Sequence, residues 1–118
     1  MTSPVRPDSP YGVGKAATEA TARYYSERFG ISCLNLRIGT VLRDDRPKNP
    51  RHYATLLSHA DLVRLVEAAI AAPPDVEYGV YFGVSANTWR FWEIANARDE
   101  IGFVPHDDAE RFRAVAEA

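Results

Sequence analysis

The 118-residue sequence predicts an α/β fold built on a parallel sheet. A predicted helix over residues 10–29 leads directly into a predicted strand over residues 31–38, and this order is half of a βαβ unit. The strand has apolar residues on both faces, which is typical of a parallel strand covered by helices. A second helix and a second strand follow further along the chain.

The first helix has clear signals at both ends. Ser9 is a good N-cap, Pro10 suits the first helical position, and Gly30 is a typical C-terminal stop. In the strand that follows, "ISCLNLRI", we expect one face to carry Leu34, Leu36 and Ile38, and the other to carry Ile31 and Cys33.

Residues 39–57 are polar and interrupted by prolines, so they predict a long loop of the kind that is usually functional or disordered. Ser58 is expected to cap a second helix, with Asp61 in its first turn and Pro73 and Pro74 after its end. The predicted apolar stripe of this helix is Leu62, Leu65, Val66 and Ala69.

The last third of the chain predicts a strand over 77–85, a helix over 87–99 and a short helix from Asp107 onward. The tryptophans Trp89 and Trp92 are expected to be packing residues. No clear linker divides the chain, but the composition changes after Ile38. We therefore expect two regions, residues 1–38 and 39–118.

The composition is that of an ordinary globular protein, with 46% hydrophobic and 25% charged residues. A net charge of −2 gives no reason to expect nucleic acid or a membrane surface as a partner. The sequence holds no apolar run of membrane-spanning length and no cluster of metal-ligating residues. A single cysteine, Cys33, excludes an internal disulfide and suits a cytoplasmic location.

Tyr11 and Lys15, in "SPYGVGKAATEA", are the strongest candidates for chemistry. Residues four apart share a helix face, so a phenol and an ammonium can meet the same ligand. A free tyrosine ionises near pH 10, and a nearby positive charge favours the ionised form, which can accept a proton. Gly12 and Gly14 would let a cofactor or a neighbouring backbone approach closely, although a frayed first turn is the alternative explanation.

The stretch "RPDSPYGVGKAATEATARYYSERFGISCLNLRIGTV" resembles the extended short-chain dehydrogenase/reductase family, also called the NAD-dependent epimerase/dehydratase family. The shared features are a proline-rich approach, a Y-x-x-x-K helix and a strand that ends in an arginine-containing motif. Later stretches, "LLSHADLVRLVEAAI", "GVSANTWRFWE" and "GFVPHDDAERF", are similar to the uronate dehydrogenase branch. The resemblance implies the C-terminal part of a Rossmann-like NAD(P)-binding fold with a small substrate-binding region.

The resemblance also implies roles for particular residues. Tyr11 would be the catalytic acid/base, and Lys15 would hold the nicotinamide ribose. The NAD site would further include Ile38 and Val41, and the substrate site would include Thr40 and Arg51. A guanidinium fork can hold a sugar carboxylate through two parallel hydrogen bonds, although an exposed loop arginine is the alternative for Arg51.

The family binds NAD through a glycine-rich turn in an N-terminal half, and that motif is absent from this sequence. We therefore expect the C-terminal part of an enzyme: a truncated gene, a misplaced start or a separate fragment. A strand without its neighbours invites self-association, so we expect the isolated chain to be loosely folded or oligomeric.

Three functions follow as hypotheses. The first is NAD-dependent oxidation of a hexuronate, a small sugar acid, at C1 to an aldarolactone, with the isolated chain inactive because the cofactor-binding half is missing. The second is a nucleotide-sugar epimerase or reductase of the same superfamily, which the short region after Ile38 argues against. The third is a non-catalytic fragment.

Overall fold

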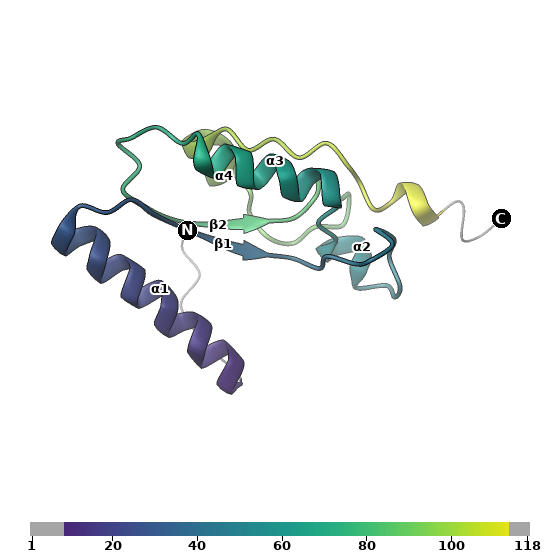
Figure 1. Cartoon of the computed structure of the whole chain (residues 1–118). Coiled ribbons are helices and arrows are strands. Elements are labelled where there is room, and N and C mark those ends of the chain that lie inside the picture. Colours follow the sequence, from purple (N-terminus) through teal and green to yellow (C-terminus); the bar gives the residue numbers. More distant parts are fainter. Residues whose placement is uncertain (1–8, 114–118) are drawn as a thin grey trace.

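The computed structural model describes residues 9–113 as a two-stranded sheet with helices on both of its faces. Strands β1 (Cys33–Ile38) and β2 (Tyr78–Gly83) are parallel and in register from Cys33↔Tyr78 to Ile38↔Gly83. Helix α1 (Pro10–Phe29) lies on one side of the sheet, and α3 (His59–Ile70) and α4 (Ala95–Ile101) lie on the other (Figure 1). The predicted α/β class is therefore confirmed, and the sheet joins the two predicted regions of the chain.

Helix α1 begins and ends where the sequence predicts. The Ser9 side chain accepts a hydrogen bond from the Gly12 amide at 3.0 Å, and Gly30 closes the helix in the left-handed conformation at φ 69°. Only Ser26 is buried along the whole helix, and its hydroxyl donates to the Glu77 carbonyl at 2.7 Å. Helix α1 is thus held at a few polar points rather than by an apolar seam.

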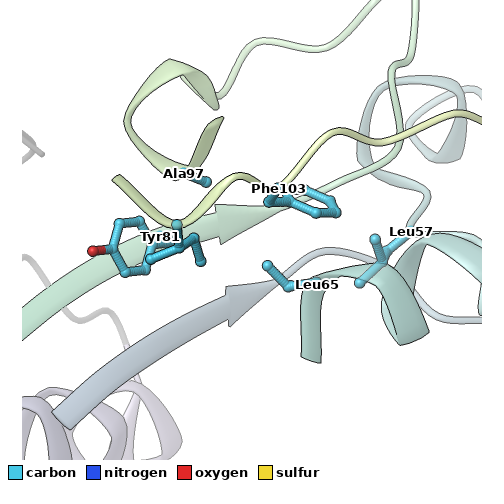
Figure 2. Packing of buried hydrophobic residues seen from close by; sticks show 6 residues of the cluster. Leu57, Leu65, Tyr81, Ala97 and Phe103 are labelled. Carbon is cyan, nitrogen blue, oxygen red and sulfur yellow. The ribbon is translucent and has the colours of Figure 1, made fainter. Parts of the chain in front are cut away.

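The hydrophobic core lies between the sheet and helices α3 and α4, on the face away from α1 (Figure 2). Its buried members are Leu57, Leu65, Tyr81, Ala97, Ile101 and Phe103. Burial and a hydrogen bond to Glu100 raise the pKa of Tyr81 to about 12, so its phenol stays neutral. Leu34 and Leu36 of β1 pack against this core, whereas Ile38 at the end of the same row is 48% exposed.

The predicted loop over 39–57 contains a short helix, α2 (His52–Thr55), whose last residues are buried. Gly39 allows this segment to approach β1, because a Cβ there would collide with the Thr55 carbonyl oxygen. Ser58 caps α3 as predicted, accepting from the Asp61 amide at 3.1 Å.

Three expectations for the helices were wrong. The core face of α3 continues from Leu62 and Leu65 to Ala68, and not to the exposed Val66. Of the helix predicted over 87–99, only the part within α4 forms. The residues before α4 pair with other segments instead: the buried Asn87 amide, for example, donates to the carbonyls of Ala54 and Leu56. The helix predicted from Asp107 also starts later than expected: residues 107 and 108 lie outside any helix, 109–110 form a turn and 111–113 are helical. The rest of that predicted helix, residues 114–118, lies outside the described residues.

Candidate active site

Tyr11 and Lys15 lie together in the first turns of α1. The Lys15 ammonium nitrogen is 5.4 Å from the centroid of the Tyr11 ring, so the two groups share one helix face. The Tyr11 side chain is 75% exposed, which leaves its phenol accessible to a ligand. Both groups are therefore available to one substrate, although their catalytic role stays a prediction.

The Tyr11–Lys15 pair opens onto a groove of about 550 Å³ between α1 and β1. The groove is lined by Tyr11, Lys15, Thr18, Glu19, Leu34, Asn35, Leu36, Arg37 and Ile38. Ile38, expected at the cofactor site, thus lines the same groove as Tyr11 and Lys15.

Residues 34–38 of β1 line this groove, and the hydrogen bonds of the strand indicate where their peptide groups point. The amides of Cys33 and Gly39 donate to β2-side carbonyls, at 2.9 Å from Glu77 and 2.8 Å from Gly83. Hydrogen-bonding direction alternates along a strand, so Leu34, Leu36 and Ile38 direct their peptide groups to the opposite edge, which has no partner strand within residues 9–113. The groove therefore combines a phenol and an ammonium from α1 with residues of β1, whose free edge carries backbone donors and acceptors.

An ion pair fixes α1 against β1 one turn beyond Lys15. Arg37 donates from Nε and from a terminal nitrogen to the two carboxylate oxygens of Glu19, both at 2.8 Å. The Arg37 hydrogen bond holds the pKa of Glu19 below its ordinary value. Glu19 was not predicted as a site residue, although it lies four residues after Lys15 and therefore on the same face of the helix.

Thr40 and Val41 follow β1 but do not line the groove described above. The Thr40 amide donates to the Thr55 carbonyl at 2.7 Å, and the two threonine hydroxyls are 2.8 Å apart. Val41 is 40% exposed. The structure thus places the predicted substrate threonine beside α2, with Thr55 as a hydroxyl partner that the sequence analysis missed.

Arg51 lies immediately before α2 and is exposed. Its guanidinium carbon is 5.7 Å from the centroid of the Phe91 ring. Arg51 forms no ion pair with any carboxylate of residues 9–113, so its fork is free for an external anion. Its role in substrate binding remains a prediction.

Gly14 has open space around it, because a Cβ at this position would meet nothing within 4 Å among the described residues. The fit of the helix to its neighbours in this structure therefore does not require the glycine. In the described part of the chain, no group of three or more His, Cys, Asp or Glu side chains could hold a metal ion, and no helix is long and apolar enough to cross a membrane.

The parallel sheet, the helix on each face and a polar groove beside the strand define a partial Rossmann-type α/β domain. Residues 1–76 match the NAD dependent epimerase/dehydratase family, and the chain belongs to that family. The predicted resemblance and the predicted fold are thus both confirmed.

Curated relatives match almost the whole chain. It is 39% identical over 116 residues to a uronate dehydrogenase of Pseudomonas putida, covering 98% of this chain and 42% of the relative. It is 38% identical over 108 residues to an NAD-dependent glucose-6-phosphate dehydrogenase of Haloferax volcanii, covering 91% of this chain and 40% of the relative. The chain therefore spans about two fifths of the length of these relatives.

Solved structures agree with this placement. The glucuronic acid dehydrogenase of Chromohalobacter salexigens superposes with a TM-score of 0.89 at 38% identity, over 99% of this chain and 42% of that one. A mutant uronate dehydrogenase of Agrobacterium tumefaciens in complex with NAD superposes with a TM-score of 0.88 at 36% identity, over 98% of this chain and 42% of that one.

Proposed function

We propose that this chain carries the proton-transfer and carboxylate-binding groups of an NAD-dependent dehydrogenase that oxidises a hexuronate at C1 to an aldarolactone. The observation that carries the proposal is the Tyr11–Lys15 pair, which opens with Ile38 onto one groove. Support also comes from similarity to proteins described as uronate dehydrogenases in three different organisms.

Tyr11 would take the proton of the C1 hydroxyl as the C1–oxygen bond becomes a carbonyl. The Lys15 ammonium lies beside the Tyr11 ring and would donate hydrogen bonds to ribose hydroxyls. NAD, when bound, supplies the acceptor for the hydride that leaves C1. The groove suits such a group, because Ile38 gives an apolar wall beside the polar pair.

Arg51 would hold the carboxylate at the far end of the sugar. A guanidinium can donate two parallel hydrogen bonds to a carboxylate, which fixes both the position and the direction of the ring. Holding C1 in place in this way removes much of the entropic barrier to reaction. The absence of an internal ion pair at Arg51, within residues 9–113, is consistent with this role.

A chimera tests the proposal directly. The matching segment of the Pseudomonas putida relative is replaced by this chain, and NADH formation is followed with galacturonate, glucuronate, galactose and glucose 6-phosphate as separate substrates. We expect turnover with a hexuronate to exceed turnover with the other two sugars. Preference for glucose 6-phosphate, the substrate in the name of the Haloferax relative, would contradict the choice of hexuronate.

Binding separates the proposal from its two alternatives. If the chimera binds UDP-glucose but not galacturonate, the nucleotide-sugar epimerase or reductase is correct. If it binds NAD but oxidises none of these sugars, the chain is a non-catalytic fragment. An unmodified Pseudomonas putida enzyme prepared in parallel shows that the assay itself works.

A further inference from the structure

Three aromatic side chains form a continuous series beside the candidate site. The Phe82 ring of β2 stacks on Trp92 with an interplanar angle of 4° and centroids 5.5 Å apart. Trp92 then meets Phe91 edge to face, with centroids 4.9 Å apart. The series Phe82–Trp92–Phe91 thus connects the sheet to the loop that precedes α4.

An arginine lies over the ring at each end of this series. The Arg37 guanidinium carbon is 5.4 Å from the Phe82 centroid, and that of Arg51 is 5.7 Å from the Phe91 centroid. Arg37 also holds Glu19, one helical turn beyond Lys15, through two hydrogen bonds. An unbroken run of side-chain contacts therefore joins the helix of the catalytic pair to Arg51.

We propose that Phe91 is a positioning residue for Arg51, and that the aromatic series sets where the substrate carboxylate is held relative to Tyr11 and Lys15. The inference rests on the proposed function. An exposed arginine samples many rotamers, and ordering it costs entropy. A ring face attracts the flat guanidinium and leaves the N–H groups at its edge free to donate to a carboxylate.

The backbone of Arg51 is held in place, so the Phe91 ring acts on its side chain. Its backbone carbonyl accepts the first bonds of the α2 turn, from the amides of Ala54 at 3.0 Å and Thr55 at 3.2 Å. The backbone of Arg51 is thereby fixed, and its side chain has no carboxylate partner among residues 9–113. The Phe91 ring then restrains the guanidinium at the other end of the side chain.

The same loop offers a matched control. Trp89 is 62% exposed and Phe91 is 59% exposed, but Trp89 has no ring contact with any residue in the described part of the chain. A change of Trp89 to leucine removes a similar exposed aromatic surface without touching Arg51. Phe91→Tyr keeps the ring and is expected to behave like the unmodified protein.

The first measurement uses the chimera and compares Phe91→Leu, Phe91→Tyr and Trp89→Leu. Losing an exposed cation–π contact should change the affinity for the carboxylate about two- to fivefold. We expect Phe91→Leu to raise KM for galacturonate by about that factor, with kcat and KM for galactose little changed. Equal effects of Phe91→Leu and Trp89→Leu, or a fall in kcat alone, would overturn the inference.

The second measurement needs no turnover and uses the full chain. The side-chain NMR resonances of Arg51 should carry a ring-current shift that Phe91→Leu removes and Phe91→Tyr retains. If the chimera oxidises no sugar, the proposed function fails and this shift alone decides the positioning role. Arg51 resonances that are the same in the unmodified chain and in Phe91→Leu refute it.

Discussion

Asn87 ties the segment that carries Thr55 to two other parts of the chain, and we predict a large loss of stability when it is changed to alanine. Its amide nitrogen donates to the carbonyls of Ala54 at 3.2 Å and Leu56 at 2.9 Å. Its amide oxygen accepts from the Ala109 amide at 2.9 Å, and the side chain is fully buried. The substitution thus removes three hydrogen bonds, although the Leu56 carbonyl keeps its bond from the Ser85 amide at 2.9 Å.

Each such hydrogen bond contributes about 1 kcal/mol net, so Asn87→Ala should lower the free energy of unfolding by about 3 kcal/mol. Asn35→Ala is the control: within residues 9–113 the Asn35 amide makes one hydrogen bond, to the Gly79 carbonyl at 3.1 Å, so its loss should cost about 1 kcal/mol.

Urea unfolding followed by tryptophan fluorescence measures both changes. With a denaturant slope of about 2 kcal/mol per molar, the midpoint should fall by about 1.5 M for Asn87→Ala and by about 0.5 M for Asn35→Ala. Equal midpoints for the two variants would refute the reasoning, because they would show that the number of side-chain hydrogen bonds lost does not govern the loss of stability.

Three further predictions concern the core, the pH dependence and the association of the chain. Leu65→Ala should destabilise the fold by about 2–5 kcal/mol in the same assay, because Leu65 is fully buried in the core, and a loss below 1 kcal/mol would contradict this packing. Burial raises the pKa of Asp61, but hydrogen bonds from Ser85, the His106 and Asp107 amides and Arg64 outweigh it and hold the value below the ordinary 3.8. The ionised Asp61 carboxylate therefore stabilises the fold fully above its ordinary pKa, and this stabilisation is lost as pH falls through its lowered pKa in the folded protein. Acid unfolding of Asp61→Asn should therefore depend less on pH than that of the unmodified chain. Within residues 9–113 one edge of β1 has no partner strand, which predicts self-association; sedimentation of the isolated chain should show oligomers, and a compact monomer would contradict it.

Local signals in the sequence predicted the first half of the fold well. Ser9 and Gly30 define α1, and Ser58 begins α3, because each of these residues satisfies backbone groups within its own turn. Helix α2 was missed because its four residues have no side-chain cap at the N-terminus and depend on packing against residues beyond Gly39. Helix α2 therefore depends on contacts with residues distant in the sequence rather than on the helix propensity of its own residues.

The same distinction explains the failure over residues 87–94. Their composition is typical of an amphipathic helix, yet Asn87 and Trp92 pair with residues far away in the sequence or on β2. Trp89, expected to be a packing residue, is instead exposed. A helical pattern of apolar residues cannot distinguish a helix from a loop whose side chains bind residues in other segments.

The candidate site was predictable to the extent that it is local. Tyr11 and Lys15 are four residues apart on one helix, so the sequence alone predicted their proximity. The placement of Ile38 in the same groove followed from the family resemblance. The contact between Arg51 and Phe91 spans the α2–β2 segment, and nothing in the local sequence of either residue indicates it.

The most direct test of the account changes Tyr11 to phenylalanine in the chimera and follows NADH formation with galacturonate. Tyr24→Phe is the control, because Tyr24 is 57% exposed on the same helix and does not line the groove. Loss of the proton acceptor should lower kcat at least about 100-fold for Tyr11→Phe and leave Tyr24→Phe unchanged. Turnover by Tyr11→Phe within a few fold of the unmodified chimera would contradict the central claim.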